Sequence, residues 1–290
     1  RLAHHNEYDF FLTPRALVKY SISPETIVRD SVGTGFRTLN LFSEDSSILA
    51  TSRNIIITEE LEPEKAINFG VNLVQYFTMN DISGNFVIDF YRTNFINQII
   101  PDYDSDPSEV TFGNLNGDSY SNILQAEASV NFIKKFDGKL SYKYSDVSYT
   151  QNGIEQEYPF VSKHNVLSSL TYAPDDDNWS ATVIVEWFGK QRLPSTSSNP
   201  VEYQRPIESD PYTLVGLQFT KRWELFEFYT GIENLLNFMQ EDPIISNNDP
   251  FGPYFDTSFI WGPTMGREIY AGFRFRLDQF WKFKKQDNEK

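Results

Sequence analysis

Apolar and polar residues alternate with a period of two in many separate segments of the chain. In one segment Leu124, Val130 and Phe132 fall at even-numbered positions, whereas Gln125 and Glu127 occupy odd-numbered positions between them. Because successive side chains of a β-strand point to opposite faces, this pattern predicts strands with one apolar and one polar face. We count about eleven such segments, at residues 16–22, 27–36, 67–73, 86–91, 124–132, 140–145, 166–172, 179–187, 215–219, 226–232 and 269–277.

The links between these segments alternate strictly between short and long. Short, turn-rich links lie at residues 23–25, 79–83, 137–138, 174–178 and 222–224. Long polar links lie at residues 37–63, 97–118, 150–161, 193–210 and 237–266. Bacterial outer-membrane barrels have this arrangement, with tight periplasmic turns and large extracellular loops. The sequence therefore predicts an all-β fold, an antiparallel transmembrane β-barrel.

The composition favours a membrane barrel over a soluble β-sandwich. The chain is polar on average, with a mean hydropathy of −0.44, yet it contains 25 Phe, 16 Tyr and 5 Trp. A barrel accounts for both properties, because its outer face meets lipid between aromatic girdles and its lumen is polar. The strands of a sandwich also alternate, but here Trp179 and Trp187 lie at the two ends of one apolar row. No apolar run approaches the ~18 residues of a transmembrane helix, so strands must cross the membrane.

One position conflicts with this scheme. In the strand predicted at residues 27–36, the register that turns Arg29 and Ser31 toward the lumen turns Asp30 toward lipid, beside Val28. A charge on the lipid face is costly to a degree that depends on its depth. Three explanations are open: a bulge that shifts the register, a position near the rim, or a second chain that covers Asp30.

The charge and the absence of Cys narrow the function classes. The formal net charge of −15 argues against nucleic acid as a partner, since nucleic-acid-binding proteins need a basic face. The chain has no Cys, which excludes thiolate metal sites and disulfides. Residues 1–6 lack the apolar core of a signal peptide, so we expect the start of an exported gene product to lie upstream.

The last strand resembles the β-signal by which barrel proteins are recognised for outer-membrane assembly. Tyr270 is followed by Gly272, and two hydrophobic residues, Phe275 and Leu277, stand two positions apart near the end. The alternate apolar residues of such an edge strand can be paired and inserted, so we expect the barrel assembly machinery as a partner. Most such proteins end at this strand, and we expect the charged tail 278–290 to lie in the periplasm.

Several segments resemble the C-terminal half of TonB-dependent receptors, particularly those of Bacteroidetes. In chain order they are Thr-Pro-Arg at 13–15, Gly-Thr-Gly-Phe-Arg at 33–37, Leu-Glu-Pro-Glu-Lys-Ala at 61–66, Gly-Ile-Glu-Asn-Leu-Leu-Asn at 231–237 and Trp-Gly-Pro-Thr at 261–264. The resemblance implies a 22-stranded barrel with an N-terminal plug. Residues 1–277 would supply about eleven of its strands, with the end of another at residues 1–5. Because an isolated half-barrel would expose two open edges to lipid, we expect the missing N-terminal plug and barrel half in a longer or second chain.

By this resemblance, the function is energised import across the outer membrane. Solute would bind at the extracellular loops and the plug, and the TonB–ExbB–ExbD complex would pull on the plug to open a path. The solute would be a metal chelate such as a siderophore, cobalamin or an oligomeric nutrient. A surface lipoprotein is a candidate partner, and outer-membrane lipid and lipopolysaccharide would surround the barrel.

Two other function classes are open. A passive porin-like or adhesion barrel would share the strand pattern, and the presence of an upstream plug separates it from a transporter. A soluble β-rich binding module is the third class, and extraction only by detergent separates it from both barrels.

Candidate solute-binding residues lie in or next to the predicted extracellular loops. Aromatic and Arg side chains are the usual anchors of a binding surface. This criterion selects Arg37, Arg92, Tyr254, Phe255 and Trp261. The alternative is that these side chains only close the loops over the mouth of the barrel.

The sequence gives little support to a metal site. His4 and His5 are adjacent on an extended segment, so their side chains point to opposite sides. Asp102, Asp104 and Asp106 alternate in a predicted loop but lack the Gly and the distal Glu of a calcium-binding loop. A solvated acidic loop is the better interpretation of these aspartates, and no cofactor is expected.

Catalysis has as little support. The chain has no Cys nucleophile, no Gly-x-Ser-x-Gly elbow and no His-Glu-x-x-His zinc motif. His164 stands at the start of a predicted strand without an evident partner. We therefore expect the protein not to be an enzyme.

Overall fold

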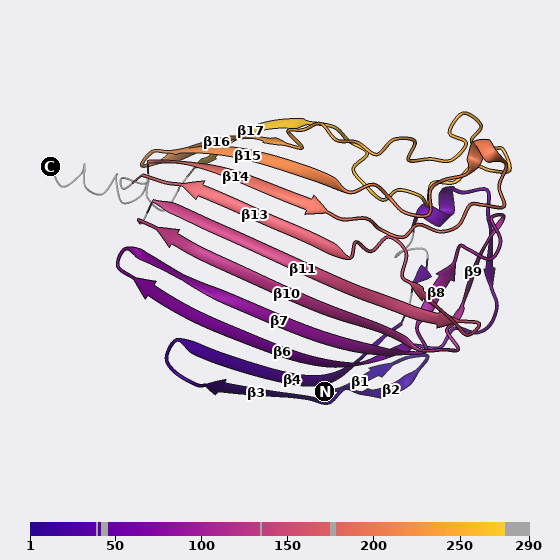
Figure 1. Cartoon of the computed structure of the whole chain (residues 1–290). Coiled ribbons are helices and arrows are strands. Elements are labelled where there is room, and N and C mark those ends of the chain that lie inside the picture. The colour runs from indigo at the N-terminus through magenta and orange to yellow at the C-terminus, as the bar shows by residue number, and fades with distance from the viewer. Residues whose placement is uncertain (39, 42–45, 134, 175–177, 276–290) are drawn as a thin grey trace, which may run out of the picture.

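The computed structural model describes residues 1–38, 40–41, 46–133, 135–174 and 178–275. Nearly all of its regular structure is β-strand, and the long strands lie side by side (Figure 1). The strands are β1 (Leu2–His5), β2 (Asp9–Leu12), β3 (Arg15–Ser21), β4 (Thr26–Arg37), β5 (Asn54–Ile57), β6 (Glu64–Met79), β7 (Ile82–Ile96), β8 (Ile99–Asp102), β9 (Glu109–Asn114), β10 (Ser119–Phe132), β11 (Phe136–Gln151), β12 (Ile154–Glu157), β13 (His164–Tyr172), β14 (Trp179–Phe188), β15 (Tyr212–Arg222), β16 (Phe226–Glu233) and β17 (Glu268–Phe275). Two short 3-10 helices, η1 (Ser46–Ala50) and η2 (Val201–Tyr203), lie in long links. Among the described residues, no helix is long and apolar enough to cross a membrane.

The main sheet is antiparallel and joins strands that are neighbours along the chain. Its order is β17-β16-β15-β14-β13-β11-β10-β7-β6-β4-β3, and β12 pairs with β11 as a twelfth member. Eleven strands lie on this path, which confirms the number expected from the sequence. Strands β3 and β17 are the two edges of the described sheet.

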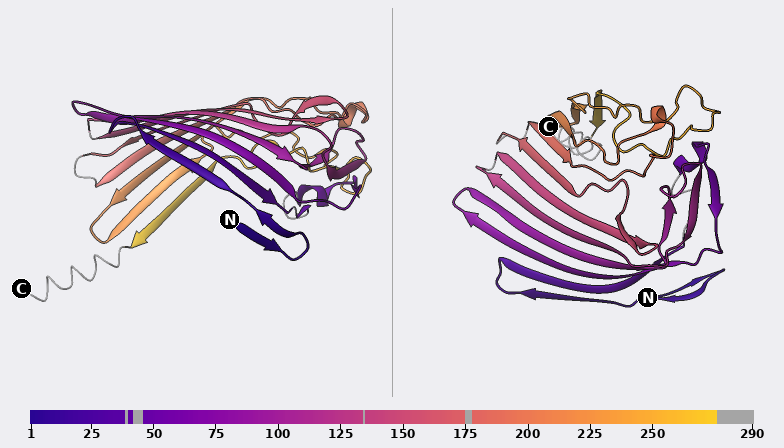
Figure 2. Two further views of the ribbon diagram at one scale, coloured as in Figure 1. Left: turned by 90° about the horizontal axis from the view of Figure 1, so that it is seen from below. Right: turned by 45° about the vertical axis from the view of Figure 1, so that its right-hand side comes forward.

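The sheet curves into an open trough with different connections at its two ends. The short turns lie at one end and the long links gather at the other (Figures 1 and 2). Within the long links, β5, β9 and β8 form a small separate sheet, and β1 pairs with β2 near the N-terminus. Residues 2–5 do form a strand, but it pairs with β2 in a separate hairpin and not with the described main sheet, as the prediction of a further barrel strand would require. The alternation of short and long links is confirmed, but the long links contain regular structure of their own.

The register separates the side chains into an apolar face and a polar face. Val28, Leu73, Ile88, Ala126 and Tyr142 are aligned across five neighbouring strands, so they form one apolar row on a single face. Leu140, on the same face, is 54% exposed, and no core covers this row within the described chain. A soluble sandwich would press such rows together, so this exposed face is what a lipid-facing wall requires.

The opposite face carries a ladder of polar side chains. Arg29, Asn72, Asp89, Gln125 and Lys143 are aligned across the same five strands. Arg29 Nη1 donates to Asn72 Oδ1 at 2.7 Å, and Asn72 Nδ2 donates to Asp89 Oδ1 at 2.8 Å. These bonds satisfy polar groups across neighbouring strands, and the row forms a wall suited to a water-filled or protein-filled lumen.

Aromatic rings gather on the apolar face near the short turns. Phe136 packs against Tyr172 with ring centroids 4.7 Å apart, and Tyr172 packs against Trp179 at 5.2 Å. Trp179 in turn lies 5.9 Å from Phe219. This chain of rings crosses four strands and corresponds to one of the aromatic girdles of a membrane barrel.

The strand that carries Asp30 has no bulge. The β3–β4 ladder runs without a break from Arg15 opposite Gly33 to Ser21 opposite Ile27, and the β4–β6 ladder is equally regular. Asp30 therefore stays on the apolar face, opposite Val18 on one side and Val71 on the other. A bulge that shifts the register is therefore wrong as an explanation. The other two explanations, a position near the rim and a second chain that covers Asp30, are still open.

A matched pair of substitutions tests the assignment of the two faces. Leu140→Arg places a charge in the middle of the apolar row of β11 and should lower the free energy of unfolding from lipid bilayers by about 2–4 kcal/mol. Ser141→Arg, one residue away on the polar face and opposite Glu127, should change it by less than about 1 kcal/mol. Urea titrations of the protein folded in vesicles measure both values, and equal losses would contradict the assignment.

Candidate functional site

The long links at one end of the sheet are folded around a small hydrophobic core of their own. Ile48 of η1 packs with Ile99, Tyr103, Val110 and Phe112, all of them buried. These residues come from links that are far apart in the sequence, at 38–63 and 97–118. The core therefore fixes the two links against each other.

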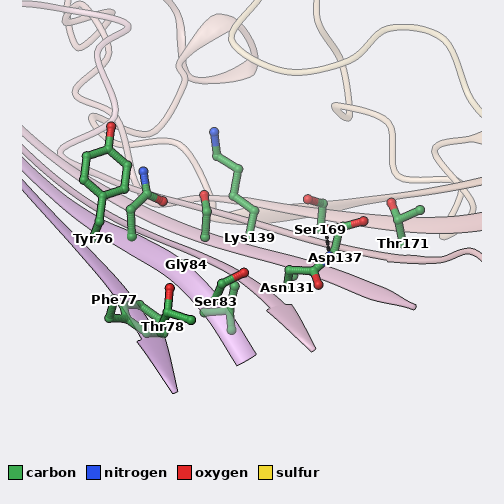
Figure 3. A pocket seen from close by; sticks show the side chains of 14 residues that line it. Tyr76, Phe77, Thr78, Ser83, Gly84, Asn131, Asp137, Lys139, Ser169 and Thr171 are labelled. Atoms are coloured by element: carbon green, nitrogen blue, oxygen red, sulfur yellow. Dashed lines mark hydrogen bonds between the residues drawn. The ribbon is translucent and has the colours of Figure 1, made fainter. Parts of the chain in front are cut away.

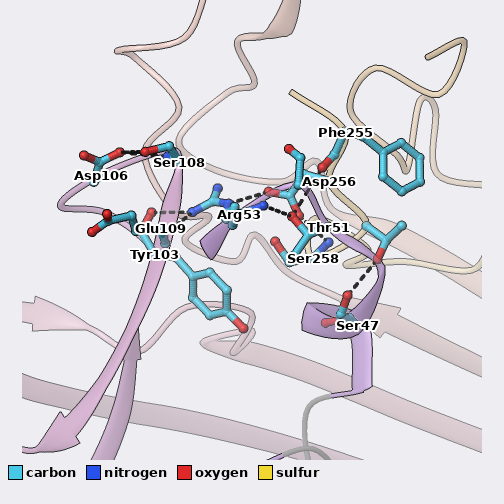
Figure 4. A network of polar contacts seen from close by, with 12 residues as sticks. Ser47, Thr51, Arg53, Tyr103, Asp106, Ser108, Glu109, Phe255, Asp256 and Ser258 are labelled. Carbon is cyan, nitrogen blue, oxygen red and sulfur yellow. Dashed lines mark hydrogen bonds and ion pairs between the residues drawn. The ribbon is translucent and has the colours of Figure 1, made fainter. Parts of the chain in front are cut away.

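A buried arginine joins these two links to a third (Figure 4). Arg53 Nε lies 2.7 Å from Asp256 Oδ2, and their side chains are 2% and 5% exposed. Arg53 Nη1 also donates to the carbonyl of Tyr103 at 3.0 Å, and the guanidinium lies 5.8 Å from the ring of Phe259. Because an unpaired buried charge is strongly unfavourable, this ion pair holds the link 234–267 against the other two.

A second ion pair joins the link 97–118 to residues 189–211. Arg192 Nη2 lies 2.6 Å from Asp104 Oδ2, and Asp104 Oδ1 accepts the backbone N–H of Ser195 at 2.6 Å. Arg192 Nη2 also donates to Gln156 Oε1 at 2.9 Å, which adds the hairpin of β11 and β12. The four links 38–63, 97–118, 189–211 and 234–267 thus form one connected unit, which we call the loop cage.

The acidic run in the link 97–118 is used for these internal contacts. The Asp102 carboxylate accepts from Ser105 Oγ and Gln151 Nε2, and Asp104 is held by Arg192 as described above. Hydrogen bonds from Ser108 hold the pKa of Asp106 below its ordinary value. Among the described residues, no group of three or more His, Asp or Glu side chains is arranged to hold a metal ion.

The histidines also have partners within the protein. His5 Nδ1 accepts the backbone N–H of Glu7 at 3.2 Å in the β1–β2 turn. His164 Nδ1 lies 2.8 Å from the Tyr142 hydroxyl on the apolar face. His164 therefore has the partner that the sequence did not reveal, because Tyr142 is 22 residues away along the chain.

A cavity of about 930 Å³ lies between residues 204–213 and 236–242 of the loop cage. Its aromatic lining consists of Tyr212, Phe238, Phe259 and Trp261. The rings of Tyr212 and Phe238 are stacked, with centroids 4.9 Å apart and planes 3° from parallel, and the Trp261 ring lies 5.9 Å from Tyr212. This volume suits a small-molecule ligand, and the flat rings suit a solute with an apolar face.

The buried side chain of Gln240 fixes the aromatic floor of this cavity. Gln240 Oε1 accepts the backbone N–H groups of Trp261 at 2.8 Å and Gly262 at 3.0 Å. Gln240 Nε2 donates to the carbonyl of Phe259 at 2.8 Å. The amide therefore makes three bonds to one short segment, and Trp261 is held in place without a ligand. Nothing in the sequence marks Gln240, because its partners lie about twenty residues further along the chain.

Among the predicted solute-binding residues, Trp261 lines this cavity and two others join loops. Tyr254 stacks on Tyr203 with centroids 4.8 Å apart, which connects the links 234–267 and 189–211. The Phe255 carbonyl accepts the backbone N–H of Ser52 at 2.8 Å, and its ring points away from the Arg53 cluster (Figure 4). Both residues fit the alternative interpretation, closure of the loops.

The two predicted arginines lie elsewhere. Arg37 Nε pairs with Glu64 Oε2 at 2.5 Å, where the long link leaves β4. Arg92 shares its face with Phe69 and Asn122 of the neighbouring strands, which is the apolar face, and its Nη1 donates to Asn122 Oδ1 at 3.0 Å. The guanidinium also lies 4.8 Å from the ring of Tyr120. Arg92 therefore does not point into the trough. Its even-numbered position in β7 puts it on the apolar face, although it lies next to a loop.

The terminal strand is locked to β16 by two reciprocal contacts between tyrosine and glycine. Tyr270 lies over Gly231, and Tyr229 lies over Gly272, so that a Cβ atom added at either glycine would overlap the ring opposite. The Tyr270 hydroxyl also donates to Gln218 Oε1 at 3.0 Å. Of the other predicted assembly residues, Phe275 pairs with Phe226, and Leu277 lies outside the described residues.

The polar wall has an open hollow of about 520 Å³ near the short turns (Figure 3). Tyr76 and Lys139 project from it toward the inside of the trough (Figure 3). Lys139 Nζ lies 2.8 Å from Glu127 Oε2, and Asn131 Nδ2 donates to Asp137 Oδ1 at 2.6 Å. Most of the side chains that line the hollow are polar, and Asp137 and Lys139 give it charges of both signs, while Phe77 and Val130 add apolar surface.

Comparisons with known proteins agree with this geometry. The family described as "TonB dependent receptor-like, beta-barrel" matches residues 2–235. The chain belongs to this family. A search among curated proteins found no match to this TonB-dependent receptor barrel.

Solved structures show the same fold at low sequence identity. A G324V mutant of the ferric enterobactin receptor PfeA of Pseudomonas aeruginosa has a TM-score of 0.64 at 13% identity, covering 94% of this chain and 41% of that chain. The siderophore receptor PirA of Acinetobacter baumannii gives 0.66 at 12%, covering 94% and 42%. The copper transporter OprC gives 0.65 at 14%, covering 92% and 40%. This barrel therefore spans about two fifths of the length of these receptors.

Asp256→Asn tests the role of the buried ion pair in the loop cage. The variant keeps the shape of the side chain but leaves the Arg53 charge without its carboxylate, which should destabilise the cage by about 3 kcal/mol. Hydrogen exchange of residues 46–57 and 99–114 should accelerate by about two orders of magnitude, while exchange in β10 and β11 stays unchanged. Glu202→Gln, in η2 of the same cage, is the matched control. Unchanged exchange in the cage of Asp256→Asn would show that the hydrophobic core alone holds it.

Gly272→Ala tests the tyrosine–glycine lock. The added methyl group should displace Tyr229 and weaken the β16–β17 pairing by about 1–3 kcal/mol, which lowers the yield of folded barrel. Heat-modifiable migration in gels measures this yield. In a Tyr229→Ser background the same substitution should cost much less, because its steric partner is gone. An equal loss in both backgrounds would contradict the lock.

Proposed function

We propose that residues 1–277 form the C-terminal half of the barrel of an outer-membrane TonB-dependent transporter. The observation that carries the proposal is that the family match covers an open half-barrel with one apolar and one polar face. Its loops would lie outside the cell, and the tail 278–290, which falls outside the described residues, would lie in the periplasm. The N-terminal plug and the first barrel half would complete the structure at the free edges of β3 and β17.

The polar wall supports docking of a plug. Its hollow near the short turns is lined by Lys139, which pairs with Glu127, and by hydroxyl and amide groups that can bond to a protein surface. Such a surface is poorly suited to an apolar occupant. In this proposal the TonB–ExbB–ExbD complex pulls on the plug and breaks polar contacts one after another, which requires less force than extracting an apolar domain.

The loop cage supports solute capture from outside. Trp261 is the predicted residue that we place in contact with solute, while Tyr254 and Phe255 join links of the cage and Arg37 pairs with Glu64 where β4 and β6 meet the first link. Arg92, on the outer face near the loops, is better placed to meet lipopolysaccharide than solute. Two of the similar structures are siderophore receptors and one is a copper transporter, which favours a metal chelate among the candidate solutes. A surface lipoprotein could cover the cage.

Conductance in planar bilayers tests the transporter against a passive porin. The complete receptor should be closed, and deletion of the plug segment that we place before Arg1 should open a steady pore. In that open pore Lys139→Glu should shift the reversal potential in a salt gradient toward cation selectivity, because Lys139 faces the lumen. Leu140→Thr, one residue away on the outer face, should leave the reversal potential unchanged.

Two results would overturn this proposal. Steady conductance of the complete protein, without any deletion, would identify a passive porin. A reversal potential that responds to Leu140→Thr and not to Lys139→Glu would show that the polar face does not line the pore.

A further inference from the structure

The rim of the loop-cage cavity is acidic. Asp210, Glu241 and Asp242 line it as exposed side chains, and none of them forms an ion pair within the described residues, while Lys190 interacts with Asp210 electrostatically. A fourth carboxylate, Glu208, pairs with Lys190 at 2.9 Å, and this contact raises the pKa of Lys190. The potential at the mouth of the cavity is therefore set mainly by unpaired carboxylates.

The cavity offers little positive charge against these carboxylates. Among the described residues that line it, Arg205 is the single cation. Its Nη1 donates to the carbonyl of Gln204 at 3.2 Å, so part of its bonding capacity is already used by the backbone. An anionic solute would meet repulsion at the rim and only one guanidinium inside.

The aromatic floor of the cavity attracts cations, as the acidic rim does. The Tyr212 ring is stacked between Phe188 and Phe238, so its own faces are covered, and Phe238 and Trp261 are the rings of this floor whose quadrupole can attract a cation. Flat faces of this size also bury the apolar side of a planar ring. Because Gln240 already holds the Trp261 segment, little ordering is needed when a solute binds.

We propose that this cavity is a binding site for a cationic solute that carries a planar ring, and that it discriminates against anionic solutes of the same shape. The ring would lie against Phe238 and Trp261, and the positive charge would face Asp210, Glu241 and Asp242. The inference rests on the proposed function, since it assigns the chemistry of the solute that the loop cage captures. It adds a constraint that family membership does not contain, namely the sign of the charge.

Fluorescence quenching of Trp261 by two probes of matched shape tests the inference. In the complete receptor in detergent, 1-methylnicotinamide, a planar cation, should quench a saturable component of the emission. Nicotinate, a planar anion of similar size, should require at least about tenfold higher concentration for the same effect. Trp261→Phe should remove the saturable component, which assigns it to this cavity.

A charge variant provides the second arm of the experiment. Asp210→Asn combined with Glu241→Gln and Asp242→Asn keeps the shape of the rim, and it should reduce the preference for the cation to less than about threefold. Retention of the heat-modifiable band confirms that each variant is folded. Equal or better quenching by nicotinate in the unaltered receptor would overturn the proposal, as would a cation preference that survives the triple substitution. Because quenching does not depend on the plug or on TonB, these results are independent of the conductance test of transport.

Discussion

The structure depends on one constraint, the need of every backbone N–H and C=O group in a lipid-exposed strand for a partner on the next strand. The antiparallel ladders from β3 to β17 meet this need continuously, even at Asp30, where a bulge would have turned a charge away from lipid. A break in the ladder would leave backbone groups unpaired in hydrocarbon, whereas one carboxylate on the outer face can be reached by water or covered by another group. The regular ladder therefore takes precedence over the placement of a single side chain. The same constraint applies to β3 and β17, whose free edges demand further strands.

A continuous ladder fixes which side chains can share a face, and the two faces then take opposite roles. The outer rows are apolar and end in aromatic rings, while the inner rows pair cations with carboxylates and amides across strands. Because the wall is rigid, the long links have fixed anchor points and can be packed against one another. The Arg53–Asp256 pair joins segments 203 residues apart in the sequence, which is affordable only when the barrel already holds those segments near each other. Rigidity of the wall is thus the precondition for a rigid loop cage.

The sequence predicts the wall far better than the cage, for a physical reason. Side-chain alternation is local, so residues such as Leu124 and Gln125 report their own faces, and the eleven strands and their links follow from it. Contacts in the cage join segments that no local pattern relates, which is why Gln240 and Tyr212 escaped notice and why the partner of His164 was not evident. Arg92 lies where the predictable strands meet the unpredictable loops. Its type and its place near a loop suggested solute binding, but its register opposite Phe69 and Asn122 puts it on the outer face, and the parity of the strand could have shown this.

The division between wall and cage also separates two kinds of charge. Along the inner wall, carboxylates such as Glu127 and Glu227 have cationic partners on neighbouring strands, so their charge is compensated locally. At the rim of the cage cavity, Glu241 and Asp242 have none among the described residues and Asp210 interacts only electrostatically with Lys190, so the field of these carboxylates extends into the mouth of the cavity. The excess of acidic residues in the chain is therefore not a uniform property of the surface. In the proposed transporter, a wall of compensated charges would hold a polar plug of either sign, whereas a rim of uncompensated ones would select what approaches. The proposal therefore assigns selectivity to the loops and passage to the barrel.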